Sequence, residues 1–118
     1  MRVLLADDEP KVRSALRLIL EQLKQVETIE EVTDAKSLAE RLRSSRPDLL
    51  LLDWELPGLQ PGTSLEDLRR RYAPLKVIVL SGRYQPPQLA IACGADAFVS
   101  KGEPPDHLFD ALRSMGAD

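Results

Sequence analysis

Short runs of apolar residues alternate along this chain with segments in which apolar side chains recur every three or four positions. The runs predict strands at residues 3–6, 49–52, 77–80 and 97–99, because they are short and bounded by polar residues. A further strand is expected at 27–32, where Ile29 and Val32 do not alternate cleanly and the mixed polarity suits a sheet edge. Strands that alternate with helices predict a parallel sheet with helices packed against it.

The segments with helical spacing predict five helices, one after each strand. Pro10 suits the first turn of the first helix, Asp34 is expected to cap the second, and Ser64 with Asp67 forms a capping-box signal for a third that runs to about Tyr72. The loop before the third helix is expected to contain Gly58, Pro61 and Gly62. The other start and stop signals are Pro47 after the second helix, Pro86 and Pro87 before the fourth, Gly94 after it and Pro104 before the fifth.

Polar residues lie where four of the five predicted strands end. Asp7 and Asp8 follow the first strand, Asp53 follows the third, Ser81 follows the fourth, and Lys101 follows the fifth after one intervening residue. Each of these residues alone is consistent with an ordinary turn, a helix cap or a solvated side chain. In open α/β sheets, however, ligands bind beyond the carboxyl ends of the strands, and together these residues predict a site there.

The charges of this cluster indicate its chemistry. Two like charges about 4 Å apart repel by roughly 4 kcal/mol at an effective dielectric constant near 20, so three carboxylates with one ammonium call for a cation. Oxygen ligands without histidine or cysteine favour Mg²⁺. A carboxylate beside Mg²⁺ can attack phosphorus, with Lys101 and the Ser81 hydroxyl stabilising the transferring oxygens and Gly82 small enough to admit them.

Composition limits the alternatives. The 118 residues suit a single domain, 1–118, and the 43% of hydrophobic residues suffice for one core. A net charge of −3 gives no basic footprint for direct nucleic-acid binding, and no stretch approaches the roughly 20 apolar residues of a membrane span, so a cytoplasmic location is expected. Cys93 is expected to be a small buried side chain, and His107, on the last helix, is expected at the surface.

The runs at residues 3–10, 52–58, 80–82 and 98–102 resemble the receiver domain of two-component response regulators, and the resemblance covers essentially the whole chain. It implies a three-layer, doubly wound (βα)5 fold of the flavodoxin-like or CheY-like type, with a five-stranded parallel sheet in the order 2-1-3-4-5. By position it implies Asp53 as the phosphoacceptor, Asp7 and Asp8 as metal-site acids, the Glu55 backbone carbonyl as a Mg²⁺ ligand, Ser81 as the switch hydroxyl, Lys101 as the phosphate-pairing lysine and Phe98 as the aromatic switch residue.

The resemblance also implies a mechanism and partners. A histidine kinase or phosphotransfer protein would donate the phosphoryl group in a Mg²⁺-dependent reaction, and the domain would catalyse only its own phosphorylation and dephosphorylation. The surface of the fourth helix, fifth strand and fifth helix would then change, which would alter binding to an output domain or downstream protein or dimerisation through that surface. The chain suits either a complete single-domain regulator or the N-terminal part of a longer one.

Three features depart from the common pattern of that family. The loop after Asp53 is about one residue longer, and Phe98 lacks the hydroxyl of a tyrosine. Glu55 and Arg83 each lie two residues after a site residue, and we hypothesise that they pair across the site entrance and gate the attacking water; two exposed charges without a shared role are the alternative.

Two other functions fit part of the pattern. A Mg²⁺-dependent phosphatase or phosphotransferase with an aspartyl nucleophile would use Glu55 as its second acid, although the chain leaves little room for a substrate-binding cap. A pseudo-receiver would bind a partner without phosphorylation, and the complete set of acids, hydroxyl and lysine argues against it.

Overall fold

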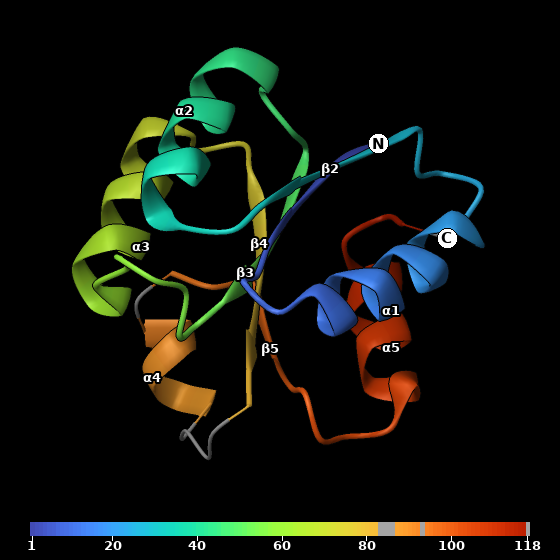
Figure 1. The fold of residues 1–118 in the computed structure, drawn as a ribbon. Coiled ribbons are helices and arrows are strands. Elements are labelled where there is room, and N and C mark those ends of the chain that lie inside the picture. The colour runs from blue at the N-terminus through green and yellow to red at the C-terminus, as the bar shows by residue number, and fades with distance from the viewer. Residues whose placement is uncertain (83–86, 93, 118) are drawn as a thin grey trace.

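Five short strands form one parallel sheet at the centre of the molecule (Figure 1). The computed structural model describes residues 1–82, 87–92 and 94–117. The strand order is β2-β1-β3-β4-β5, which confirms the predicted order. The strands are β1 (Arg2–Ala6), β2 (Thr28–Val32), β3 (Leu49–Asp53), β4 (Lys76–Ser81) and β5 (Ala97–Ser100). The strand expected at 27–32 therefore exists as β2, at the sheet edge that its mixed polarity favoured.

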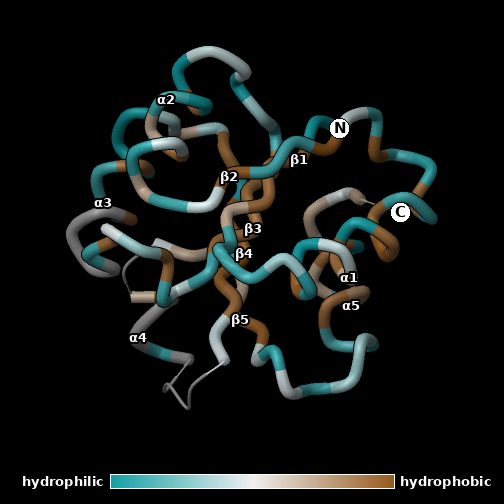
Figure 2. The backbone as a smooth tube through the Cα atoms, viewed as in Figure 1, coloured by the Kyte–Doolittle hydropathy of each residue, from teal (hydrophilic) through white to brown (hydrophobic). Residues whose placement is uncertain are grey.

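Helices cover both faces of the sheet in the described part of the chain. Figure 1 shows α2, α3 and α4 on one face and α1 and α5 on the other. The helices are α1 (Pro10–Glu21), α2 (Ala35–Ser45), α3 (Pro61–Arg71), α4 (Pro87–Ala92) and α5 (Pro105–Ser114). Figure 2 shows hydrophobic residues along the central strands, while the outer helices and loops mix hydrophobic and hydrophilic residues. The predicted three-layer (βα)5 architecture is confirmed.

Strand β3 explains why its sequence is an unbroken apolar run. Leu50 and Leu52 belong to the hydrophobic cluster beneath α2 and α3, whereas Leu49 and Leu51 belong to the cluster beneath α1 and α5. All four leucines are at most 1% exposed. A strand with neighbours on both sides and helices on both faces has no side chain that can reach water, so alternation is lost.

The register of the strands brings the polar residues together. Ala6 pairs with Leu52, so the residues that follow them, Asp7 and Asp53, lie beside each other at the same edge. Asp53 and Ser81 are the last residues of β3 and β4, and Lys101 directly follows β5. Strands β3, β4 and β5 thus each end one residue later than predicted.

The predicted start of the third helix is wrong. Helix α3 begins at Pro61 with Gln60 at its N-cap, so Ser64 lies inside the first turn and does not cap it. Proline fixes φ near its helical value and lacks the N–H that would be unpaired in a first turn, which lets the helix begin at Pro61. By contrast, Asp34 caps α2 as predicted: its side chain accepts a hydrogen bond from the Ser37 N–H at 2.7 Å.

Two further sequence predictions concern the ends of α4. The N–H of Gly94 donates to Ile91 O at 3.0 Å, and its φ of +109° is a conformation that glycine adopts readily, in keeping with the predicted helix end. Pro86 and Cys93 lie outside the described residues.

In the part of the chain that the structure describes, no helix combines the length and apolar character required to span a bilayer.

The burial pattern predicts how the fold responds to truncation of a leucine. Replacing Leu50, which is fully buried, by alanine should lower the free energy of unfolding by about 2–5 kcal/mol, because it leaves a cavity beneath α2 and α3. Leu18→Ala is the matched control, since Leu18 is 64% exposed and should change stability by less than about 0.5 kcal/mol. Urea denaturation measures both, and equal effects would contradict the assigned core.

Candidate functional site

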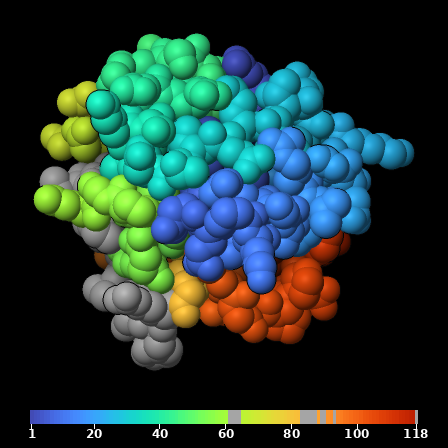
Figure 3. Space-filling model, viewed as in Figure 1, coloured from blue at the N-terminus to red at the C-terminus, as the bar shows by residue number. Residues whose placement is uncertain are grey.

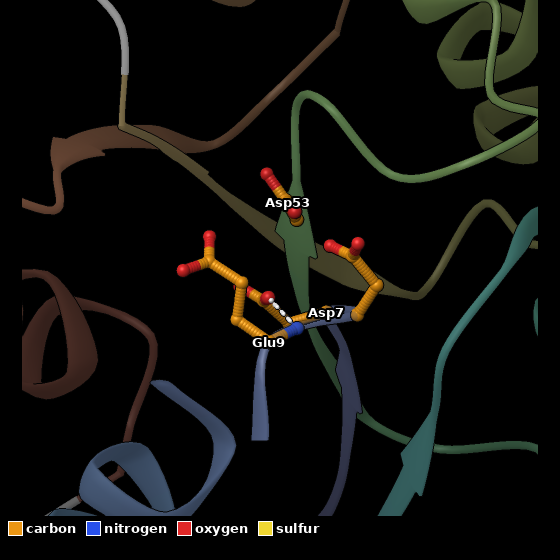
Figure 4. Close-up of side chains that lie close together, drawn as sticks. Asp7, Glu9 and Asp53 are labelled. Carbon is orange, nitrogen blue, oxygen red and sulfur yellow. Dashed lines mark hydrogen bonds between the residues drawn. The ribbon is translucent and has the colours of Figure 1, made fainter. Parts of the chain in front are cut away.

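Four carboxylates gather at the carboxyl ends of β1 and β3. Each of Asp7, Asp8, Glu9 and Asp53 offers one oxygen, and these oxygens all lie within 4.8 Å of one another. Asp7 and Asp53 are buried, with 1% and 2% exposure, whereas Asp8 and Glu9 are exposed. Figure 4 shows Asp7, Glu9 and Asp53 close together, with the Glu9 N–H donating to Asp7 Oδ1. Sequence reasoning identified Asp7, Asp8 and Asp53 but missed Glu9, although Glu9 continues the same acidic run.

Lys101 lies among these carboxylates. Its Nζ is 2.8 Å from Asp7 Oδ2, 3.4 Å from Asp53 Oδ1 and 3.3 Å from Glu9 Oε1. Its side chain is only 15% exposed, so it has little access to water. One ammonium against four carboxylates leaves three formal negative charges in the cluster.

Burial and charge shift the pKa values of two groups here. Burial is the main reason that the pKa of Asp53 is raised, and the nearby charges of Asp7 and Glu55 add to it. The Glu55 N–H, 3.0 Å from Asp53 Oδ1, and the charge of Lys101 partly offset that rise. For Lys101, burial alone would lower the pKa, but the close contact with the Asp7 carboxylate and the negative charge of Asp53 outweigh it and raise the pKa. The ammonium is therefore strongly held in its charged form.

The residues present fit a magnesium ion. Asp7 Oδ2 is buried and makes no hydrogen bond of acceptable geometry among the described residues, although Lys101 Nζ lies within ion-pair distance. A buried carboxylate oxygen with only a charge contact is well suited to a cation. The surrounding donors are carboxylate oxygens, which Mg²⁺ prefers, and no described histidine belongs to the group. Asp7, Asp8 and Asp53 would hold the ion, with Glu9 at its margin.

Glu55 binds the predicted switch hydroxyl. The Ser81 Oγ donates to the Glu55 carboxylate, with Oε1 at 3.0 Å and Oε2 at 2.9 Å, and the Gly82 N–H donates to Oε1 at 3.2 Å. Ser81 itself has no exposed surface. The hypothesis that Glu55 pairs with Arg83 stays a prediction, because Arg83 lies outside the described residues. The Glu55 carbonyl remains a predicted Mg²⁺ ligand.

The remaining predicted residues occupy different surroundings. Phe98 is partly buried and packs against the hydrophobic cluster beneath α2 and α3. His107 is 57% exposed and contacts Glu103, which confirms the predicted surface position.

A cavity of about 420 Å³ opens above the site and is lined by Asp8, Glu9, Asp53, Glu55, Gly82 and Lys101.

Arg13 on α1 holds the backbone of the acidic run in place. Its guanidinium donates to the Asp7 backbone carbonyl at 2.8 Å and to Glu31 Oε1 on β2 at 2.9 Å. Arg17, one turn later on α1, donates to the other oxygen of Glu31 at 2.8 Å. These contacts fix the peptide between Asp7 and Asp8, although neither arginine enters the site.

The chain is similar to response regulators in sequence. A family model described as the response regulator receiver domain matches residues 3–113. The response regulator UvrY of Escherichia coli K12 is 30% identical over 117 residues, which cover 98% of this chain and 54% of UvrY. The chain thus spans about half the length of the curated relatives it matches.

Solved structures give the same result for the fold. The isolated REC domain of RcsB from Salmonella enterica serovar Typhimurium, in the presence of phosphomimetic BeF3−, has a TM-score of 0.88 at 27% identity, with 98% of this chain and 88% of that chain covered. RcsB from the same organism, bound to promoter rprA, has a TM-score of 0.87 at 28% identity, covering 97% of this chain and 67% of that one.

The raised pKa of Asp53 predicts a pH-dependent stability. The folded state binds this proton more tightly than the unfolded chain does, so the contribution of the group is present below its unfolded pKa of about 3.9 and is lost as pH rises through the folded pKa. Asp53→Asn should therefore raise the free energy of unfolding at pH 7 without Mg²⁺, and the gain should shrink towards pH 4. Urea denaturation measures this effect. Glu40→Gln, which removes an exposed charge on α2, is the control, and an equal gain in both variants would contradict the prediction.

The role of Arg13 predicts an effect on Mg²⁺ affinity. Arg13→Met should weaken Mg²⁺ binding roughly tenfold, because outer-shell contacts of this kind orient metal ligands. Arg41→Met is the matched control: Arg41 pairs with Glu30, the neighbouring residue on β2, but from α2 and away from the acids. Titration with Mg²⁺, followed by Trp54 fluorescence, compares the variants. A similar loss in both would mean that the effect comes from β2 as a whole.

Proposed function

We propose that this chain, which belongs to the response regulator receiver domain family, is a signalling switch that accepts a phosphoryl group on Asp53. The observation that carries this proposal is the position of Asp53: its buried carboxylate ends β3 inside the acidic cluster, 3.4 Å from Lys101, and it lines a cavity open to a donor. Residues 1–118 would make up the receiver domain, and a histidine kinase or phosphotransfer protein would supply the phosphoryl group.

The transfer is a displacement at phosphorus. A carboxylate oxygen of Asp53 forms the new O–P bond, the P–N bond of the donor phosphohistidine breaks, and the imidazole nitrogen leaves and takes up a proton. Lys101 offsets charge on the transferring oxygens, and bound Mg²⁺ would supply further charge neutralisation. Hydrolysis later breaks the O–P bond with water and restores the Asp53 carboxylate.

The switch would work by a shift between two conformations. The phosphoryl group offers strong acceptors to the Ser81 hydroxyl, and movement of Ser81 would leave space into which Phe98 can turn. Phe98 lies on β5, so the surface of α4, β5 and α5 would change with it. That surface would then bind an output domain, a downstream protein or a second copy of the chain.

A structurally similar protein suggests what output the switch would control. RcsB is described as bound to a promoter, and this chain covers only 67% of that structure. Any DNA binding would therefore belong to a further domain or partner, because this segment carries a net charge of −3.

The enzyme alternative is less well supported. A phosphatase of the aspartyl type would need the Glu55 carboxylate as its second acid, but that carboxylate accepts from Ser81 and Gly82. The pseudo-receiver alternative predicts that one of the residues needed for phosphorylation is absent. Asp7, Asp53 and Lys101 are all present and lie together at the site.

Phosphorylation can be tested directly with a small donor. With Mg²⁺ and acetyl phosphate, intact mass should increase by one phosphoryl group, and the fluorescence of Trp54, the only tryptophan, should change. Asp53→Asn should abolish the mass increase, and Lys101→Met should slow it roughly a hundredfold by removing the charge beside the transferring oxygens. Glu40→Gln should behave like the wild type. A mass increase that persists in Asp53→Asn would refute the assigned phosphoacceptor.

A further inference from the structure

We propose that Glu55 is an internal competitor of the phosphoryl group: its carboxylate occupies two donors beside Asp53, Ser81 Oγ–H and Gly82 N–H, that would otherwise bind phosphoryl oxygens. The inference rests on the proposed phosphorylation of Asp53. It adds that the unphosphorylated conformation is held by a specific anion–donor contact, which the incoming phosphoryl group must displace.

The backbone brings Glu55 to this position. The Trp54 N–H donates to Leu80 O at 2.8 Å, which ties the turn after β3 to the end of β4. The Glu55 N–H donates to Asp53 Oδ1 at 3.0 Å, so the residue contacts the phosphoacceptor through its backbone. Its side chain then reaches Ser81, the last residue of β4, and Gly82, which follows that strand. One residue thus connects the phosphoacceptor with both donors.

The geometry makes Glu55 and the phosphoryl group exclusive occupants. A serine hydroxyl has one proton and donates it to one acceptor group at a time, and the Ser81 proton is directed at the Glu55 carboxylate. Gly82, Glu55 and Asp53 line the same cavity, so a phosphoryl group on Asp53 would face the Glu55 charge. The Glu55 carboxylate and the phosphoryl group are both anions and would repel each other in one cavity. Each hydrogen bond that the phosphoryl group makes to these donors therefore replaces one that Glu55 makes.

The sign of the effect separates this role from a merely structural one. If Glu55 competes, its removal strengthens binding of a phosphoryl analogue. If Glu55 only holds Ser81 ready to meet the phosphoryl group, its removal weakens binding. The neutral Glu55→Gln retains an acceptor and loses the charge, so a competitor should give an intermediate gain, with Glu55→Ala giving the full one.

Beryllofluoride (BeF3−) with Mg²⁺ is a suitable probe, because it binds without a covalent step and Trp54 lies beside the site. We expect Glu55→Ala to bind it roughly tenfold more tightly than the wild type, since hydrogen bonds to a charged acceptor are strong. Glu40→Ala, which removes a carboxylate from the exposed face of α2, is the matched control and should leave the affinity unchanged. Unchanged or weaker binding by Glu55→Ala would overturn the proposal.

A second background separates competition for the hydroxyl from plain charge repulsion. In Ser81→Ala the hydroxyl is absent, so Glu55→Ala should gain clearly less than it gains beside an intact Ser81. An equal gain in both backgrounds would mean that the charge of Glu55 acts without the contact to Ser81, and would overturn the proposal.

A ligand-free measurement keeps the inference distinct from the proposed function. In the absence of Mg²⁺ and BeF3−, amide hydrogen exchange of Gly82 should accelerate in Glu55→Ala, because its N–H loses the carboxylate acceptor. An unchanged rate would refute the contact itself. If the exchange accelerates but neither the wild type nor Glu55→Ala binds BeF3−, the proposed function fails, and the competitor role fails with it.

Discussion

The constraint on which the site depends is the crowding of carboxylates at the end of a sheet that cannot move them apart. Strand register sets Asp7 beside Asp53, and both side chains are buried. Lys101 approaches both, but one ammonium cannot balance the cluster. Burial and repulsion therefore leave Asp53 with a raised pKa and leave Asp7 Oδ2 without a well-formed hydrogen bond. In the proposed function, a divalent cation would relieve this state and a phosphoryl group on Asp53 would change it again, so that the site would act as a switch.

The sheet beneath the site is apolar and buried, in contrast to the crowded charges at its edge. The leucines of β3 are buried on both faces of the sheet and pack against two separate groups of helices. Their burial supplies stability that offsets the unfavourable charges at the strand end, in line with the general cost of active sites to the fold. The outer-shell contacts of Arg13 lie between the two regions, since they join α1 and β2 to the peptide that carries the acids.

Much of this organisation could be predicted from the sequence, because it follows from hydrophobic patterning. The buried run of β3, the edge position of β2 and the meeting of Asp7, Asp53, Ser81 and Lys101 all follow from where apolar segments begin and end. The start of α3 could not be predicted in the same way, because two local signals, Pro61 and the Ser64 capping box, competed within four residues. The hydrogen bond between Ser81 and Glu55 was missed for another reason. It depends on how the turn after β3 bonds to Leu80, and no sequence pattern reports that hydrogen bond.

The two glutamates of β2 bear on how the exposed edge of the sheet meets other protein chains. Glu30 pairs with Arg41 on one side of the sheet, and Glu31 pairs with Arg13 and Arg17 on the other. An unpaired sheet edge is a template for strand addition, and charged side chains fixed along it are a natural protection against such pairing. The paired charges of Glu30 and Glu31 are therefore suited to protect the β2 edge from strand addition. Figure 3 shows the surfaces of α1, in blue, and α5, in orange to red, side by side on the face of the sheet where Arg13 and Arg17 hold Glu31.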